Sequence, residues 1–102
     1  MPRFDLYRNP NPRATHALYL DVQSDLVTTA TRWCVPLRKA EPGQPVLQRA
    51  QSTFTVQGEP FVLDPPNILA VPTPLLRQPV RSLTEGEQAV VEACLDFMLR
   101  GW

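Results

Sequence analysis

The twelve prolines of this chain constrain its fold more than any other feature of the sequence. A proline inside a helix removes a backbone donor and breaks the helix, whereas turns and edge strands tolerate proline. Here the prolines stand between short apolar runs, as in segments 9–12 and 64–67. The pattern therefore excludes a mainly helical protein. It predicts a β-rich body of short strands separated by proline-marked turns.

One domain is expected over residues 1–102, because the chain has the usual size of a single compact core. Its ten basic and ten acidic side chains cancel, so charge alone favours binding neither to DNA nor to an anionic membrane. No segment approaches the roughly 20 apolar residues of a membrane span, and the N-terminal residues do not resemble a signal peptide. We therefore expect a cytoplasmic protein.

The central stretch, residues 17–37, predicts two strands. Apolar residues recur at every second position in each half, which places on the inner face Leu18, Leu20, Val22, Trp33, Val35 and Leu37. The polar segment 24–31 between them contains two neighbouring aliphatic residues, Leu26 and Val27. Two interpretations of this pair stay open: a small cluster tucked under the loop, or a contact surface.

Shorter strands are predicted at residues 4–7, 53–56, 60–63 and 68–71. The glycine-containing segment 57–59 is typical of a tight hairpin turn between two of them. Segment 38–48 is rich in turn residues and predicts a surface loop. The prolines of segment 73–82 suit an edge strand, whose outer N–H groups face solvent.

One helix is predicted, beginning after Thr84. Thr84 and Glu87 have the spacing of a capping box, in which each side chain accepts a hydrogen bond from the other residue's backbone N–H. Apolar residues then recur at helical spacing, at Val90, Val91, Cys94, Leu95 and Met98. The helix should therefore be amphipathic and pack on the sheet.

Residue types needed for catalysis are sparse in this sequence. Cys34 and Cys94 lie far apart without a CxxC motif, and we predict two reduced core residues. His16 is the single histidine and is predicted to be a solvated strand-end residue, so neither a metal site nor another cofactor is expected. There is no Ser-His-Asp set and no glycine-rich phosphate loop. The sequence favours a binding protein over an enzyme.

Two features are candidate contact points for a partner. Arg8 and Arg13 flank the proline loop 9–12, which is either a solvated loop or a docking site for an acidic peptide. Trp102 follows Gly101 at the end of the sequence, where it either folds back on the body or inserts into a partner.

The segment LYLDVQSDLV, residues 18–27, resembles the CcdB family of plasmid-maintenance toxins. The similarity continues through the VPL of residues 35–37, the AVP of residues 70–72 and the closing helix, and it covers essentially the whole chain. The resemblance implies a mainly β fold, an SH3-like β-barrel with a small additional sheet and one C-terminal α-helix. It also implies a homodimer.

The resemblance further implies a function. Such a toxin binds the A subunit of DNA gyrase, traps the complex in which DNA is cleaved, and is neutralised by a CcdA-like antitoxin, so that DNA is contacted only indirectly. The implied gyrase-binding residues are Leu26, Val27, Asp96, Leu99, Arg100, Gly101 and Trp102. Antitoxin contact is assigned to Arg8, Arg13 and Trp102.

Two alternatives remain open. The family's closing tripeptide is typically tryptophan, glycine and isoleucine, whereas this chain has Arg100 and Trp102 around Gly101. A protein that keeps the fold and antitoxin binding but has a lost or altered target is therefore the second hypothesis. The third is an endoribonuclease of the MazF kind, which shares an SH3-like architecture, although no convincing catalytic set of basic and hydroxyl groups is present.

Overall fold

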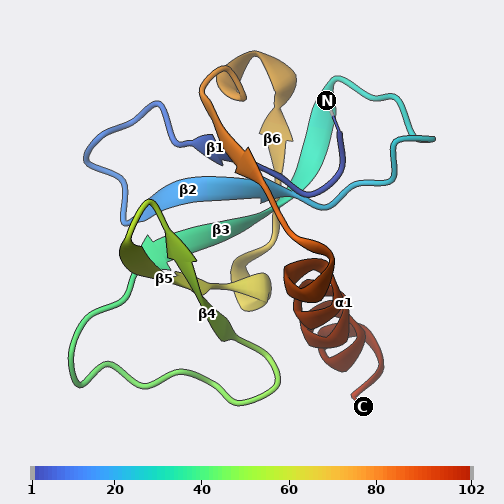
Figure 1. The fold of residues 1–102 in the computed structure, drawn as a ribbon. Coiled ribbons are helices and arrows are strands. Elements are labelled where there is room, and N and C mark those ends of the chain that lie inside the picture. Colours follow the sequence, from blue (N-terminus) through green and yellow to red (C-terminus); the bar gives the residue numbers. More distant parts are fainter. Residues whose placement is uncertain (1, 102) are drawn as a thin grey trace.

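The computed structural model describes residues 2–101, and these form a curled sheet with one α-helix at its C-terminal end (Figure 1). The strands are β1 (Asp5–Arg8), β2 (His16–Asp21), β3 (Thr31–Lys39), β4 (Ser52–Val56), β5 (Glu59–Leu63), β6 (Leu69–Pro72) and β7 (Pro79–Ser82). Two short 3-10 helices, η1 (Pro65–Asn67) and η2 (Thr73–Leu75), flank β6, and α1 (Glu85–Arg100) closes the chain. The predicted mainly β fold with a C-terminal helix is confirmed.

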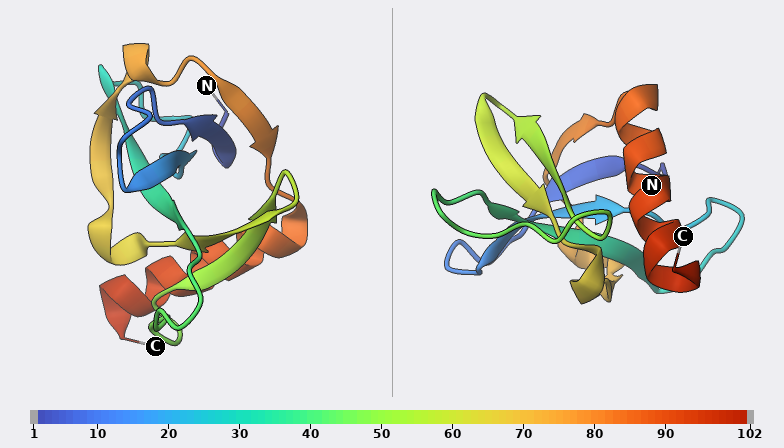
Figure 2. Two further views of the ribbon diagram at one scale, coloured as in Figure 1. Left: turned by 90° about the vertical axis from the view of Figure 1, so that its left-hand side faces the viewer. Right: turned by 90° about the horizontal axis from the view of Figure 1, so that it is seen from below.

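All strand pairs are antiparallel, and the main strand order is β4-β5-β3-β2-β1-β7. The long strand β3 has two partners on one side: β6 pairs with its first half and β5 with its last residues. All seven strands therefore belong to one sheet, which β6 joins through β3. Figure 2 shows how the sheet curls toward closure. Arg81 Nη2 of edge strand β7 donates to the Thr55 carbonyl of edge strand β4 at 2.9 Å, as suits an SH3-like barrel.

The predicted hairpin between β4 and β5 is confirmed. Val56 pairs with Glu59, which leaves Gln57 and Gly58 as a two-residue turn. Both turn residues have positive φ, 52° and 78°. This is the backbone of the type I′ turn, whose twist matches that of the flanking strands.

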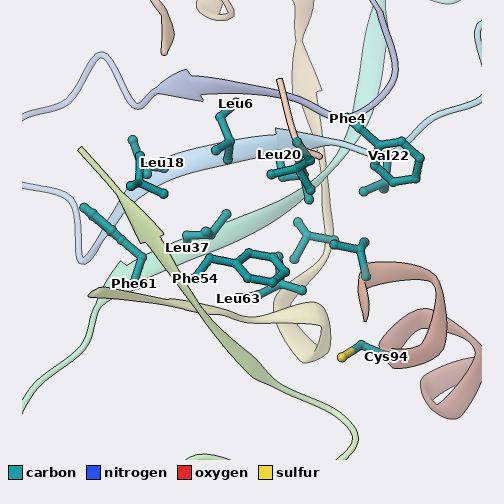
Figure 3. Close-up of a cluster of buried hydrophobic side chains, with 14 residues drawn as sticks. Phe4, Leu6, Leu18, Leu20, Val22, Leu37, Phe54, Phe61, Leu63 and Cys94 are labelled. Carbon is teal, nitrogen blue, oxygen red and sulfur yellow. The ribbon is translucent and has the colours of Figure 1, made fainter. Parts of the chain in front are cut away.

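The main core lies inside the curl of the sheet (Figure 3). It is built from alternate residues of the strands together with the inner face of α1, including Leu6, Leu20, Leu37, Phe54 and Val91. A second, smaller cluster lies on the other face of β3, around Cys34, Val71 and Leu76. Strand β3 is therefore buried on both faces over much of its length.

Both cysteines are buried free thiols, as predicted. Burial raises the pKa of Cys34 to about 12 and also raises the pKa of Cys94. A thiol with a raised pKa is seldom the reactive thiolate. Neither cysteine is therefore suited to nucleophilic chemistry.

The predicted capping box begins α1. Thr84 Oγ1 accepts from the Glu87 N–H at 3.2 Å, and Glu87 Oε1 accepts from the Thr84 N–H at 3.0 Å. Arg81 adds a bidentate ion pair to Glu87, with both N–O distances 2.8 Å, and this pair holds the pKa of Glu87 at about 2. The helix packs on β4 and η1. Its buried stripe is narrower than predicted, because Val90 and Met98 are exposed.

Candidate functional site

A network of polar contacts surrounds the loop between β2 and β3, residues 22–30, here called the binding loop. Arg32 and Asp21 form a buried bidentate ion pair, with Nε–Oδ2 at 2.8 Å and Nη2–Oδ1 at 3.0 Å. The same guanidinium donates from Nη2 to the Gln23 carbonyl and to Asp25 Oδ1, each at 3.1 Å. The hydrogen bond to Asp21 raises the pKa of Arg32. The loop is thus anchored to a charge inside the protein.

Gln23 joins the two ends of the binding loop. Its Nε2 donates to the Val27 carbonyl at 2.8 Å and to Thr29 Oγ1 at 3.1 Å, while its Oε1 accepts from the Trp33 N–H at 2.9 Å. The Val27 N–H donates to the Ser24 carbonyl at 3.1 Å and closes a turn. One side chain therefore replaces the ladder hydrogen bonds that the loop lacks.

Asp25 ties the binding loop to the N-terminal segment. Its two carboxylate oxygens accept from the Arg3 N–H at 3.0 and 3.2 Å. Arg3 returns a hydrogen bond from Nε to the Val22 carbonyl at 2.8 Å. The Arg3 N–H, followed by the Arg32 guanidinium, lowers the pKa of Asp25. Asp21, Gln23, Ser24 and Asp25, the polar residues of the DVQSD segment, thus all serve to fix the loop.

The fixed loop holds its aliphatic pair in solvent. Leu26 is 95% exposed and Val27 is about half exposed. The interpretation that the two residues tuck under the loop as a small cluster is therefore wrong. Exposed aliphatic side chains on a preorganised backbone are typical of a contact surface, because little conformational entropy remains to be lost on binding.

Trp33 belongs beside this pair, although the alternating pattern predicted it on the inner face. Trp33 is 58% exposed. Together with Val22, Gln23, Ser24 and Val27 it lines a shallow cavity of about 380 Å³. Trp33 lies near the start of β3, outside both buried clusters. Its position next to the loop was the only sequence signal that could have identified it.

The last turns of α1 lie on the same side of the molecule as the binding loop (Figure 1). Arg3, which binds Asp25, also reaches Glu92 of α1 at 4.0 Å. Asp96 and Leu99 follow Glu92 by four and seven residues and so share its helix face. Leu99 is 78% exposed.

The helix ends in an ordered cap. Asp96 Oδ1 accepts from Arg100 Nη2 at 3.1 Å. Gly101 adopts φ 80° and donates to the Phe97 carbonyl at 2.8 Å. The left-handed conformation at this position favours glycine. Trp102, predicted in both contact sets, lies outside the described residues.

The structure separates the two predicted contact sets. Arg8 and Arg13 belong to the end of β1 and the β1–β2 loop, on the opposite side of Figure 1 from the binding loop. Arg8 Nη2 donates to Gln57 Oε1 of the β4–β5 turn. The Arg13 N–H donates to Asn11 Oδ1 at 3.0 Å. A single partner surface can include both sets only by wrapping around the barrel.

His16 is not the solvated residue that the sequence predicted. Its Nε2 lies 2.8 Å from Oδ2 of the buried Asp64, a residue distant in sequence. Asp64 also accepts from Gln51 Nε2 at 2.8 Å and from Asn67 Nδ2 at 2.7 Å. Burial raises the pKa of Asp64, but the hydrogen bonds from Asn67, Gln51 and His16 outweigh burial and lower it. Among residues 2–101 no group of three metal-ligating side chains occurs.

The fold defines a small protein with a curled β-sheet and one C-terminal helix, in which a hydrogen-bonded loop and the helix end expose aliphatic side chains. A model of the CcdB protein family matches residues 3–101, and the chain belongs to that family. The family comprises toxins of toxin–antitoxin modules, which act as poisons rather than as catalysts. No individual curated protein gives a significant match to the chain. Within residues 2–101, no helix combines the length and apolarity needed to cross a membrane.

Proposed function

We propose that this protein binds the A subunit of DNA gyrase and traps the complex in which DNA is cleaved. The observation that carries the proposal is Leu26, an almost fully exposed aliphatic side chain on a loop fixed by a buried ion pair. Val27 and the helix-end residues Asp96, Leu99, Arg100 and Gly101 extend this surface. Trp102 completes the proposed contact set.

The proposed mechanism needs no chemical step by the toxin. A ligand shifts a conformational equilibrium only by its differential affinity for the states. The toxin therefore has to bind the cleaved state of gyrase more tightly than the resealed state. A rigid loop suits this task, because it fits one arrangement of the target and adapts poorly to others.

We further propose a homodimer. Its support is the exposed apolar side chains at the start of β3 and around β6, where Trp33 pairs with the exposed Ala70, and the exposed Ile68 precedes β6 two residues before Ala70. A monomeric protein seldom leaves large apolar side chains grouped in this way. A second copy of the chain would cover them.

The neutralising partner is proposed to be a CcdA-like antitoxin that contacts Arg8 and Arg13, with Trp102 as a further contact. Both arginines lie away from the binding loop, so the antitoxin can begin to bind while gyrase occupies the loop. The module acts in the cytoplasm, where gyrase acts on DNA.

A lost or altered target is the second candidate. The observation in its favour is the helix end, where Arg100 pairs with Asp96 instead of presenting an aromatic ring. Under this alternative the fold and the antitoxin partner are kept, whereas gyrase is unaffected.

The test is gyrase-mediated DNA cleavage. Purified protein is incubated with gyrase from its own host, supercoiled plasmid and ATP, and the denatured products are examined for linear DNA. We expect linear DNA with the whole chain and none after deletion of Gly101 and Trp102. The melting temperature should stay largely the same, because among the described contacts only the cap hydrogen bond to Phe97 is lost. If the truncated chain still produces linear DNA, the tail is not part of the gyrase site. If the whole chain produces no linear DNA, the result favours a lost or altered target.

A further inference from the structure

A groove that shares no lining residue with the binding loop has the chemistry of a peptide site. It lies between the start of the β1–β2 loop and the η2–β7 connection and has a volume of about 430 Å³. This groove, here called the proline groove, is lined by Arg8, Pro10, Pro74, Leu75, Arg77 and Gln78. Its volume falls within the range of ligand pockets in proteins.

Both walls of the proline groove are preorganised. The Arg8 N–H donates to the Gln78 carbonyl at 2.9 Å and joins the two walls. Asn9 Oδ1 accepts from the Asn11 N–H at 2.9 Å, which fixes the turn that contains Pro10. Because the rings of Pro10 and Pro74 have little freedom to lose, their contacts with a ligand cost little side-chain entropy.

The groove is positively charged within a neutral chain. Residues 6–20 and 65–84, which supply both walls, contain four arginines and no aspartate or glutamate. Of these arginines, Arg81 is neutralised by Glu87. Within residues 2–101, neither Arg8 nor Arg77 forms an ion pair with a carboxylate. Two uncompensated guanidinium groups therefore border one groove.

The other lining residues indicate whether the groove suits a nucleic acid or an acidic peptide. Leu75 is 42% exposed, and with Pro10 and Pro74 it gives the groove an apolar surface. No aromatic side chain lines the groove, whereas single-stranded nucleic acids are bound by stacking bases on aromatic rings. Arginines beside an apolar floor instead suit carboxylates and an aliphatic side chain of one peptide.

We propose that the proline groove binds an extended acidic segment of the antitoxin, with carboxylates on Arg8 and Arg77 and an aliphatic side chain on Leu75. This inference rests on the proposed neutralisation by an antitoxin, whose contact at Arg8 it specifies. It adds Arg77 and Leu75 to that contact. The groove shares no lining residue with the binding loop, and the two meet through η2, where the Thr73 N–H donates to the Ala30 carbonyl at 3.1 Å. A segment bound in the groove therefore leaves Leu26 and Val27 uncovered.

The experiment uses a fluorescein-labelled dodecapeptide of glutamates with leucine at every third position, measured by fluorescence anisotropy against the whole protein. The Arg77→Gln variant should bind it about fivefold more weakly, and the Arg8→Gln, Arg77→Gln double variant more than about tenfold. Leu75→Ser should weaken binding about threefold. Arg77 has no intramolecular partner among the described residues, so its variant should keep the melting temperature.

Matched controls separate a groove from general attraction. Arg49→Gln removes the same charge beside Phe97 of α1 and should leave peptide binding unchanged. A dodecapeptide with glutamine in place of glutamate should bind much more weakly. Equal losses with Arg49→Gln, or equal binding of the glutamine peptide, would overturn the proposal. So would tighter, Arg77-dependent binding of oligothymidylate, which would assign the groove to nucleic acid.

The two proposals fail separately. Arg77→Gln should leave gyrase-mediated DNA cleavage at the wild-type level, because Arg77 forms no ion pair among residues 2–101 and lines no cavity with the binding loop. If the wild-type protein produces no cleavage but binds the acidic peptide through Arg77, gyrase is excluded and the groove stands. If it produces cleavage but shows no Arg77-dependent peptide binding, the groove proposal is wrong and the gyrase proposal stands.

Discussion

Two long loops of this protein expose aliphatic side chains, but the protein fixes them in different ways. The binding loop presents Leu26, and the longer loop 40–51 presents Leu47. The first is held from inside by the Arg32 guanidinium, which is itself buried against Asp21. The second is held mainly by Gln51, whose Oε1 accepts from the Leu47 N–H at 2.9 Å and whose Nε2 donates to Asp64.

The difference shows why exposure alone does not identify a contact surface. An exposed aliphatic residue on a loosely held loop loses conformational entropy when a partner orders it, and this loss offsets the burial of its surface. Leu26 has little such entropy left to lose. The binding loop is anchored by a buried pair of opposite charges, whereas loop 40–51 is anchored to the buried Asp64 through the neutral side chain of Gln51, and this difference separates Leu26 from Leu47.

The largest expected effect follows from breaking the buried anchor. Arg32→Met leaves the fully buried Asp21 carboxylate without its partner, and removal of one member of a buried pair costs about 3–5 kcal/mol. We expect a loss of this size in the free energy of unfolding, measured by urea denaturation. The binding loop should lose amide hydrogen-exchange protection as well.

Two controls show whether the lost pair is the cause. Arg49→Met removes a surface arginine from Phe97 and should cost far less. The Asp21→Asn, Arg32→Met double variant carries no unpaired charge and should recover part of the stability. If Arg32→Met were as stable as the wild type, the binding loop would not depend on this anchor.

A smaller effect on stability is expected at acid pH, in loop 40–51. Hydrogen bonds hold the pKa of Asp64 below its ordinary value of 3.8. A carboxyl whose folded pKa is depressed contributes stability above its unfolded pKa and loses that contribution as the pH falls through the folded value. Below pH 3.8, loop 40–51 should therefore loosen as Asp64 is protonated and its hydrogen bonds weaken.

Hydrogen exchange of the Leu47 N–H, followed between pH 5 and acid conditions and corrected for intrinsic rates, measures this loosening. Asp64→Asn supplies the reference, because it removes the titrating group and should lose the acid step. A step of equal size in that variant would assign the loosening to another carboxylate.

Local sequence patterns predicted the elements whose causes are local. The hairpin at Gln57 and Gly58 depends on two adjacent positive φ values, and the capping box depends on Thr84 and Glu87 three residues apart. Each cause lies within a few residues, so the sequence displays it directly. The buried core positions of β2 followed from alternation for the same reason.

The errors concern contacts between distant segments. His16 meets Asp64, and nothing near His16 in the sequence indicates that partner. Alternation placed Trp33 on the same side as Val35. It does not show that the side chain of Trp33, near the start of β3, is exposed to solvent. The resemblance of the DVQSD segment to the CcdB family indicated where the binding loop lies. The hydrogen bonds that fix the loop could be identified only from the structure.

Of the variants considered, Leu26→Asp should have the smallest effect on stability and a large effect on gyrase binding. Leu26→Asp changes a side chain that is 95% exposed, so the free energy of unfolding should change by less than about 0.5 kcal/mol. If Leu26 is a central contact, its loss should weaken gyrase binding by about 2 kcal/mol, or ~30-fold, and reduce linear DNA accordingly. Leu47→Asp is the matched control on loop 40–51 and should alter neither quantity. If both variants lose cleavage equally, the added charge, and not the fixed loop, causes the loss of gyrase binding. If Leu26→Asp greatly lowers the melting temperature, the Leu26 side chain supports the fold.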